Sequence, residues 1–585
     1  MQVYKSKKDA SIPVNIILTE GPEKEPPDYP NEEEKSSVED IMVVQRAYRL
    51  FSDFKGVIVD LTYGFNEWQV TREFFFKTSA LDAFRIVEVE LNFMYDLLYT
   101  KMVVVHGKYG FCFRILCLVL FAVALGLFVS HHKHHKHEIH GIDIYITYIL
   151  LIGAIGLDIF GIIKLFLSDW TIAALSDIWI PDRHKNCKQK LLSSLFDFRI
   201  NLSFDKNYRW SRSISQHSLV TYCLKKERFK WIYKLVYIFG AKEFVDEILY
   251  KKTVHVEENL TKLEKLWKLL TPRWMKVKEK IVGKNLKVFI FKELRKKAEK
   301  AKTAKEAKEI CSWRGEKPLS EAPRCFTSLV ESVEVEYDES VLRWHLATEL
   351  CYHTDKDDYK EEKCQFSKVL SQYMLYLLVM RPTMMSQVTG ILQIRFQDTC
   401  AEAKKFFGSG REPTRDAHEE AGKLFCNKLV EAIKMFFGFA HAPTPKGIYE
   451  VPKPDDACVK ACEKLLGVDT VVAPGKVKGG TSKSVLFDAC IMAKELKKLD
   501  KADRWELISK VWVELLCYAA SHCKAHVHAQ QLSKGGEFIS FVWLLMFHFG
   551  MGEQFHFGIG EQLRVIPEHR YKLIAGKDYL EDLKS

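Results

Sequence analysis

Two long apolar runs near the front of the chain most constrain its fold. They extend from Phe111 to Ser130 and from Ile142 to Leu167, with the polar sequence HHKHHKHEIH between them. A transmembrane helix needs about 20 mostly apolar residues, and each run is long enough. We therefore predict a transmembrane helical hairpin with spans at about 111–130 and 142–167.

Two charged residues inside these runs are candidates for a special role. Arg114 lies near one end of the first run, where it can snorkel toward water. Asp158 lies well inside the second run, and an Asp at mid-membrane costs about 2.5–3.5 kcal/mol. We expect Asp158 to face another helix, because Ala154 and Gly161 on the same face allow close approach. A contact with Arg114 or with another subunit is favoured, while a proton or ion path and a water-exposed acid remain open.

The composition indicates that most of the chain lies outside the bilayer. Its 47% hydrophobic and 28% charged residues are typical of soluble globular proteins. The 15 cysteines have irregular spacings without a CxxC pair, which favours reduced thiols in the cytosol. No N-terminal signal peptide is visible, so we expect the internal spans to direct targeting.

Basic residues flank the outer sides of the two spans. They are Lys101, Lys108 and, just inside the first span, Arg114 on one side, and Lys164 near the end of the second span followed by Arg183, Lys185, Lys188 and Lys190 on the other. By the positive-inside rule we expect both long soluble regions in the cytosol. The connecting loop is expected in the lumen or exterior, although Lys133 and Lys136 weaken this assignment.

Composition and periodicity divide the chain into five segments. Apolar residues recur at helical spacing, as at Val44, Ala47 and Phe51, and further helical stretches are expected through Leu219 to Leu270. The segments are a disordered acidic arm at 1–40, amphipathic helices and the hairpin at 41–180, a basic helical region at 181–325, a C-terminal helical domain at 326–560 and a tail at 561–585. We predict an all-α fold, a transmembrane helical hairpin plus a large helical cytosolic domain.

The most basic stretch of the chain is 271–310. Its preferred interpretation is a solvated helix with intrahelical pairs such as Glu299 with Lys302. Phe289 and Phe291 interleaved with the charges leave an anionic lipid surface as an alternative. No nucleic-acid-binding module accompanies the charge, which argues against a nucleic-acid partner.

Two apolar stretches in the C-terminal part, Val369 to Met380 and Phe538 to Met551, are too short to span a bilayer. We expect both to be core helices. One helical face is lined by Trp505, Ile508, Trp512, Leu515 and Ala519, and its simplest role is packing.

Several polar clusters invite an enzymatic interpretation without supporting it. His131, His132, His134, His135, His137 and His140 suit a metal by type, but an exposed turn is preferred because a specific site needs fixed geometry. His522, His526 and His528 lack the zinc-protease pattern, since Cys523 stands where that pattern has Glu. The loop PGKVKGGTSKS does not fit the phosphate-binding pattern GxxxxGK[ST]. We therefore assign no catalytic, metal-ligating or cofactor-binding residue and no cofactor.

The sequence LSKGGEF is read as a turn between helices. Gly535 and Gly536 let the backbone bend, and Glu537 is well placed at the start of the next helix.

Several sequence blocks resemble a known family. AYRLFSDFKGVIVDL, DAFRIVEVELNFMYDLLYTK, DIYITYILLIGAIGLDIFGIIKLFLSDWT and RWSRSISQHSLVTYCLK resemble the plant membrane family catalogued as domain of unknown function 4220. WHLATELCYH, SQYMLYLLVMRPTMM, GILQIRFQDT, KSVLFDACIMAKEL, VWVELLCYAASHC and HAQQLSKGGEFISFVWLLMFHFGMGEQF resemble its usual companion, domain of unknown function 594.

The resemblance implies a multi-span plant membrane protein but brings no established reaction, cofactor or catalytic residue. Its motif residues of unknown role are His345, Trp512, Glu514, His528, Gly535, Gly536 and Glu537. Members typically carry more hydrophobic segments before the AYRLF block, where this chain has the acidic arm. A shortened member or an incomplete gene product would explain the difference, and lost spans would change the expected topology.

We favour an integral membrane protein that acts as a membrane-anchored interaction or scaffold protein. Its expected partners are membrane lipids and either another protein or a second copy bound through the spans. A transporter or channel subunit that uses Asp158 is one alternative, and a membrane-surface enzyme of unknown chemistry is another. The sequence favours a non-enzymatic role and does not identify the membrane, the ligand or the oligomeric state.

Overall fold

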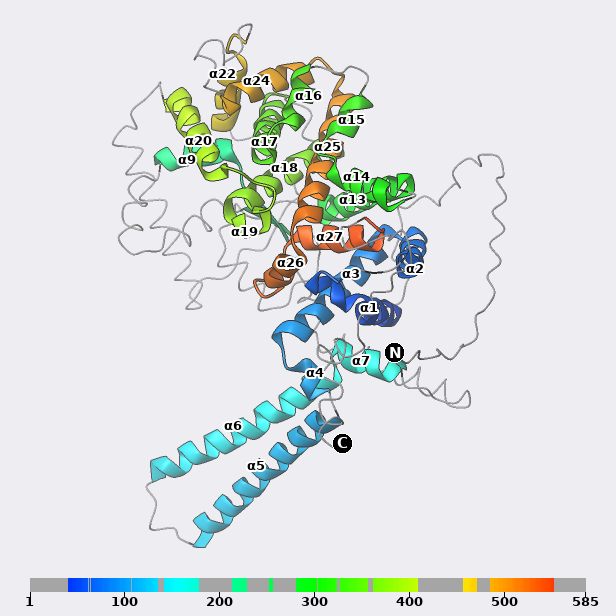
Figure 1. The fold of residues 1–585 in the computed structure, drawn as a ribbon. Coiled ribbons are helices and arrows are strands. Elements are labelled where there is room, and N and C mark those ends of the chain that lie inside the picture. Colours follow the sequence, from blue (N-terminus) through cyan, green and yellow to red (C-terminus); the bar gives the residue numbers. More distant parts are fainter. Residues whose placement is uncertain are drawn as a thin grey trace, which may run out of the picture.

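Helices α5 (Lys108–His134) and α6 (Gly141–Phe166) project as a hairpin from a body of packed helices in the computed structural model (Figure 1). The structure describes residues 40–61, 63, 65–106, 108–134, 141–177, 213–228, 252–255, 280–301, 303–322, 327–355, 361–408, 456–470 and 484–551. The predicted helical hairpin is confirmed in place and extent.

The two hairpin helices pack on each other, with the rings of Phe128 and Tyr148 in edge contact at 5.2 Å. The stretches Cys112–Ser130 and Ile144–Phe166 are long and apolar enough to cross a membrane. None of the α5 stretch and 6% of the α6 stretch is buried. A core helix of the same composition would be mostly buried, so this hairpin is not part of the core.

The chain before the hairpin forms the amphipathic helices that its periodicity predicts. They are α1 (Asp40–Phe54), the 3-10 helix η1 (Lys55–Val59), α2 (Phe65–Phe76) and α3 (Ala80–Tyr99). Ser79 caps α3, because its hydroxyl accepts the N–H of Asp82. Val44 and Phe51 of α1 are buried, and α3 packs against α1, α13 (Lys280–Lys300) and α27 (Phe538–His548).

Two short helices connect the hairpin to the body, α4 (Met102–Val105) and α7 (Asp169–Asp177). Trp170 of α7 lies among the rings of Tyr48, Phe51 and Phe93, at 6.0, 5.8 and 5.1 Å between centroids. Such edge-to-face aromatic contacts each add about 0.5–1.5 kcal/mol beyond burial. Trp170 therefore fastens the end of the hairpin to α1 and α3.

The basic helix α13 belongs to the body. Ile290, Phe291 and Leu294 are fully buried against neighbouring helices, while Lys292 and Lys296 are exposed. The lipid-surface alternative for this stretch is wrong in this respect, because the apolar residues it requires face the protein core. The solvated-face interpretation fits, although Lys302 and residues 271–279 lie outside the described part.

The helical body is built around α17 (Tyr337–Thr354), α18 (Glu362–Met380) and α25 (Lys501–His522). Around them lie α14 (Ala304–Ser312), α15 (Glu316–Ser320), α16 (Thr327–Glu334), α19 (Pro382–Met385), α20 (Leu392–Gly408), α22 (Asp456–Leu466), α24 (Val485–Leu496) and α26 (Ala525–Leu532). A capping box of Thr303 and Glu306 starts α14. The predicted core helices are confirmed, since α18 and α27 are buried along most of their length and Trp505 and Trp512 are fully buried.

One departure from helix follows the hairpin. β1 (Ser213–Gln216) pairs antiparallel with β2 (Lys252–His255), with Ile214 opposite Val254, and these are the two strands among the described residues. The helix predicted from Leu219 is confirmed as α9 (Leu219–Arg228), but helix is wrong for 252–255. There, the β-branched residues Thr253 and Val254 suit a strand that has a pairing partner.

Several features of the sequence lie outside the described residues. These are the acidic arm up to residue 39, the loop residues His135, His137 and His140, the loop at 471–483 that contains most of PGKVKGGTSKS, and the tail from 552. His131, His132 and His134 fall at the end of α5.

Candidate functional site

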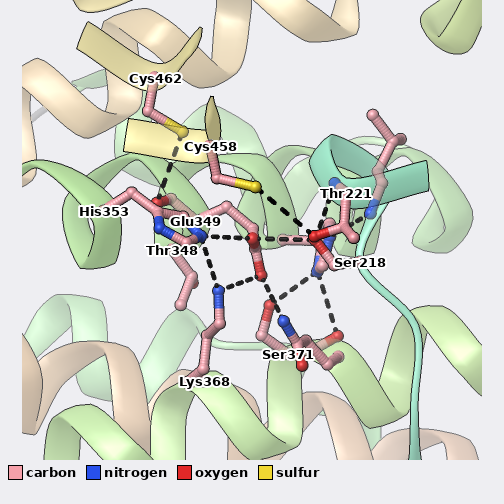
Figure 2. Close-up of polar contacts among 12 residues, drawn as sticks. Ser218, Thr221, Thr348, Glu349, His353, Lys368, Ser371, Cys458 and Cys462 are labelled. Carbon is pink, nitrogen blue, oxygen red and sulfur yellow. Dashed lines mark hydrogen bonds and ion pairs between the residues drawn. The ribbon is translucent and has the colours of Figure 1, made fainter. Parts of the chain in front are cut away.

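A group of buried and half-buried polar side chains surrounds the buried Glu349 of α17 (Figure 2). One carboxylate oxygen accepts from Lys368 Nζ at 2.6 Å and Gln372 Nε2 at 2.9 Å. The other accepts from Ser218 Oγ at 3.0 Å and His353 Nε2 at 3.3 Å. We call these five residues the Glu349 centre. They bring α17, α18 and the start of α9 to one carboxylate.

Electrostatics keep Glu349 ionised. Burial alone would raise the pKa of this carboxyl, but Lys368, with further help from His353 and His345, holds the pKa well below its usual value. A buried charge is tolerated only when it is paired and hydrogen-bonded, and Glu349 meets both conditions. The centre therefore holds a buried ion pair between α17 and α18.

His345 lies one helical turn before Glu349 and extends the polar contacts. Its Nε2 accepts the backbone N–H of Leu219 at 3.2 Å, so Nδ1 carries the hydrogen and donates to Ser371 Oγ at 2.8 Å. Burial lowers the pKa of His345 to about 4, which leaves the imidazole neutral at neutral pH. This histidine binds the start of α9 to α17 and α18.

Two thiols of α22 border the Glu349 centre (Figure 2). Cys462 Sγ lies 4.0 Å from the carbonyl oxygen of Glu349, and Cys458 Sγ lies 3.7 Å from Thr221 Oγ1. Burial raises the pKa of the Cys462 thiol well above its ordinary value. A protonated, buried thiol is a poor nucleophile, so this pair packs rather than reacts.

The Glu349 centre has the chemistry of a framework. Glu349 and His345 are both fully buried, and both oxygens of Glu349 are engaged by neighbouring side chains. General acid–base catalysis requires a group within reach of a substrate proton. What the arrangement can do is hold three helices in register through one charge.

An open hollow of about 590 Å³ lies elsewhere, between α16, α17, α20 and α24, and its wall is largely acidic. Its cations are already committed to carboxylates of the wall. Arg343 contacts Glu339 at 2.5 Å and Asp488 at 2.9 Å, and Arg395 contacts Glu339 at 3.4 Å. These pairs tie the helices together and leave no built ligand site.

Comparison with known protein families finds a match in the N-terminal part of the chain and another in the C-terminal part. Residues 5–223 match the family described as Domain of unknown function (DUF4220), and residues 497–551 match Protein of unknown function, DUF594. The chain therefore carries one match to each of these two domains of unknown function. The N-terminal and C-terminal placement of the two domains is confirmed, although the DUF594 match begins at residue 497 and leaves out the resembling blocks between 344 and 496. No curated protein and no solved structure matches the chain.

The Glu349 centre connects DUF4220 to the middle of the chain. Ser218 and Leu219 lie near the end of the DUF4220 match, whereas Glu349 and His345 follow it. The hydrogen bonds from Ser218 and to His345 therefore attach the last DUF4220 block to α17.

A second buried polar contact connects DUF4220 directly to DUF594. His548 of α27 contacts Glu90 Oε2 of α3 at 2.7 Å and Thr71 Oγ1 of α2 at 2.9 Å. The ring of Phe75 stacks on His548 at 4.6 Å. Thr71, Glu90 and His548 are at most 1% exposed, which keeps a substrate out. The two domains thus form one packed body.

Trp512 and Glu514, two DUF594 motif residues, are bonded inside the body. Trp512 Nε1 donates to Thr348 Oγ1 at 3.0 Å. Glu514 accepts from Lys297 Nζ at 2.7 Å and from the backbone N–H of Gly315 at 3.0 Å. Burial raises the pKa of Glu514, and Lys297 opposes that shift.

His528 is also bonded inside the body. Its Nε2 donates to the carbonyl oxygen of Ala520 at 3.3 Å, and its Nδ1 accepts from Ser540 Oγ at 3.0 Å. Burial lowers the pKa of His528 to about 3, and the neutral ring stacks on Trp543 at 4.6 Å. The histidine connects α26 to α25 and α27.

The turn before α27 has the expected form. Gly535 and Gly536 have φ values of 94° and 69°, a region that side chains other than glycine rarely adopt. Glu537 stands at the N-cap of α27, and its carboxylate accepts from Tyr376 and Arg381, each at 3.0 Å. These bonds therefore attach the start of α27 to the end of α18.

The hairpin residues Asp158 and Arg114 lie near the contact between α5 and α6. Arg114 packs against Gly161, where a Cβ would collide with its guanidinium group. One carboxylate oxygen of Asp158 is buried without a hydrogen-bond partner. Within the described chain, Asp158 and Arg114 make no ion pair, so Asp158 remains a candidate for contact with another chain.

Sequence reasoning singled out His345 but missed Glu349 and Lys368. A signal was present, because His345, Glu349 and His353 recur every four residues and therefore share one helical face. The Glu90–His548 contact had no such signal, since its partners are 458 residues apart.

Proposed function

We propose that this chain is a membrane-anchored interaction protein whose α5–α6 hairpin crosses a bilayer and whose helical body lies at the bilayer surface. The observation that carries the proposal is that these helices are both apolar and uncovered. Their 19- and 23-residue stretches have lengths of about 29 and 35 Å at 1.5 Å per residue. The hydrocarbon core of a bilayer is about 30 Å thick.

The exposed side chains support a lipid environment. Leu127, Ile149, Leu150 and Leu157 are 67%, 70%, 67% and 73% exposed. Leaving apolar surface in water costs about 25 cal/mol per Å². A bilayer removes this cost, and none of the described elements of the body covers these helices (Figure 1).

The polar motif residues support an interaction role over a reaction. His345, Glu514, His528 and Glu537 are all buried and bonded to neighbouring helices. Residues used in this way build a rigid body that can present its surface to a partner. Because α5 and α6 are antiparallel, the helices before and after the hairpin lie on one side of the membrane. The flanking Lys and Arg residues favour the cytosolic side.

Alkaline carbonate extraction tests the anchor. We expect the full chain to stay in the membrane pellet and to be released by detergent. A variant in which a short Gly/Ser linker replaces residues 112–166 should appear in the supernatant. A full chain released by carbonate would overturn the anchor.

Quantitative mass spectrometry of proteins that co-purify from gently solubilised membranes tests the interaction role. We expect a near-stoichiometric partner, either another protein or a second copy of the chain. Comparison with Asp158→Leu and Asp158→Asn locates the contact, since a partner held by Asp158 within the membrane is lost from the Leu variant. Recovery of the single chain with lipid alone would contradict the interaction role.

A transporter subunit is the second candidate, favoured by the buried, unpaired carboxylate oxygen of Asp158. In that case Asp158→Leu abolishes flux in reconstituted vesicles while assembly is retained. Equal flux in both proteins would reject this candidate.

A further inference from the structure

The base of the hairpin exposes apolar side chains outside the two spans. Leu98 and Tyr99 end α3 and are 42% and 44% exposed, and Val104 of α4 is 71% exposed. Lys101 and Lys164 are exposed in the same region. We call these five residues the collar. Exposed apolar patches usually mark a binding surface. This one combines apolar and basic side chains and lies beside two apolar helices.

Hydrogen bonds place α4 at the level where α6 leaves the hairpin. His106, the C-cap of α4, contacts Ser168 Oγ at 2.9 Å and Thr171 Oγ1 at 3.2 Å. Ser168 follows the last residue of α6, Phe166, by two positions. Val104 precedes His106 by two positions and therefore lies at the same level as the end of the α6 span.

This level corresponds to the polar layer of a bilayer. Helix α5 begins at Lys108, four residues before its apolar stretch starts at Cys112, a rise of about 6 Å. The headgroup layers add roughly 10–15 Å to the hydrocarbon core, or about 5–8 Å on each side. The collar residues of α3 and α4 precede Lys108, and Lys164 lies two residues before the end of the α6 stretch, so the collar lies in or against one headgroup layer when the hairpin is inserted.

The exposed charge at this level is positive. Lys101 and Lys164 face solvent, whereas the described acids Asp96 of α3 and Asp169 of α7 are turned into the body. Asp169 is 5% exposed, and Asp96 accepts the indole N–H of Trp170 at 3.0 Å. Lys side chains beside a membrane attract anionic headgroups, and Tyr is enriched at this depth. The ring of Tyr99 is 44% exposed at this level, and its hydroxyl donates to the carbonyl oxygen of Ala529 in the body at 3.2 Å.

We propose that the collar is a binding surface for anionic phospholipid headgroups, with Val104 inserted into the interfacial layer and Lys101 and Lys164 facing the phosphates. The inference rests on the proposed function, because the collar reaches lipid only when the hairpin is inserted. It goes further in assigning a lipid class and a docking face to the body.

Photo-crosslinking in lipid nanodiscs tests the collar. The full chain carries p-benzoylphenylalanine in place of Val104, Val70 or Leu120, in discs of phosphatidylcholine with phosphatidylserine. Val70 of α2 is a matched control, since it is 73% exposed and belongs to the body. Leu120 of α5 reports insertion of the span. We expect lipid adducts at 104 and 120 and none at 70.

The other results separate the two proposals. Adducts at 120 with none at 104 overturn the collar and leave the anchor standing. No adduct at 120 overturns the anchor and the collar with it. Equal adducts at 104 and 70 also overturn the collar, because exposure alone would then explain the labelling.

The lipid class is read from the adduct masses at position 104. We expect phosphatidylserine to be enriched over its share in the disc, and the paired change Lys101→Glu and Lys164→Glu to reduce that enrichment about fivefold or more. The paired change Lys292→Glu and Lys296→Glu on α13 is the control and should leave it unchanged. Enrichment that survives the Lys101 and Lys164 changes, or is absent from the start, overturns the anionic specificity.

Discussion

At the scale of single residues, the body depends on buried charges that are paired with an opposite charge, and Glu349 is the example with the most hydrogen bonds described above. Glu349 is fully buried, and the side chain of its counter-ion Lys368 is 14% exposed. Separating such a pair leaves one charge in a medium that solvates it poorly. Most of the lost stability is then the free-energy cost of keeping the remaining charge buried without a counter-ion.

We expect Glu349→Gln to destabilise the body by about 3–5 kcal/mol, because Lys368 loses its counter-ion. Denaturant unfolding followed by circular dichroism in detergent measures the change. Replacing both members with apolar residues, Glu349→Leu with Lys368→Met, should cost less than the single change.

Glu506→Gln is the matched control for this prediction. Glu506 also pairs with a lysine of α18, Lys363, but its side chain is 42% exposed. Solvent screening limits the loss to below about 1 kcal/mol. Equal losses for Glu349→Gln and Glu506→Gln would show that burial is not what makes the Glu349 pair important.

At the scale of elements, the packing of α7 on α1 and α3 attaches the hairpin to the body. Its Trp170 lies among rings of α1 and α3 and donates to Asp96 of α3. Burial raises the pKa of Asp96 to about 6, the bond from Trp170 opposes that shift, and Asp169 adds to it. The ionised form of Asp96 is therefore less favourable in the folded protein than in the unfolded chain.

This raised pKa predicts that the stability of the contact between α3 and α7 depends on pH. The folded state keeps the Asp96 proton between about pH 4 and 6, where the unfolded chain has lost it, so ionisation destabilises the fold most above pH 6. Asp96→Asn should exceed the parent in stability by about 1–3 kcal/mol at pH 7.5, and the difference should shrink as the pH falls from 6 to 4. Thermal unfolding at pH 7.5, 5 and 4 measures it.

The exposed Asp398→Asn on α20 controls for the loss of one negative charge. Its difference from the parent should stay small at every pH. A gap between Asp96→Asn and the parent that does not change with pH would contradict the assignment of the effect to Asp96.

At the scale of the whole molecule, DUF4220 and DUF594 pack against each other through α3 and α27. The contact holds Glu90, His548 and Thr71 away from water. Because α3 also packs against α1 and α13, a change in this contact reaches the helices that lead to the hairpin. We therefore expect local unfolding of α3 in DUF4220 and of α27 in DUF594 to occur together.

Glu90→Gln should therefore increase hydrogen exchange in α3 and α27 together. The loss of about 1–3 kcal/mol expected for a buried acceptor corresponds to roughly 5–150-fold in protection. Hydrogen exchange with mass spectrometry measures both helices in one experiment, and the exposed Glu309→Gln is the control. Faster exchange in α3 alone would show that the domains open separately.

The hairpin contributes little to the core, so the body should fold without it. Replacing residues 112–166 by a short linker should remove the helical signal of α5 and α6 themselves and leave the melting temperature of the body nearly unchanged, measured by circular dichroism. The reason is that the buried core lies in the other helices. A variant that loses cooperative melting would mean that the hairpin stabilises the body.

The sequence alone determined the local architecture. Apolar runs of membrane length, the helical spacing of residues such as Phe51, and the Gly535–Gly536 turn depend on neighbouring residues, and their predictions are confirmed. Residues 252–255 were misjudged, because strand formation there depends on a partner about 40 residues earlier in the chain.

The tertiary structure decided which polar residues meet. Glu349 with Ser218, and Glu90 with His548, come together only when distant helices pack, and helical periodicity shows which face is buried but not what it faces. It also decided that Phe291 faces the core rather than a lipid surface, since both environments accept the same apolar side chain. Charge and hydrophobicity are properties of the residue, whereas burial and partnership are properties of the packed chain.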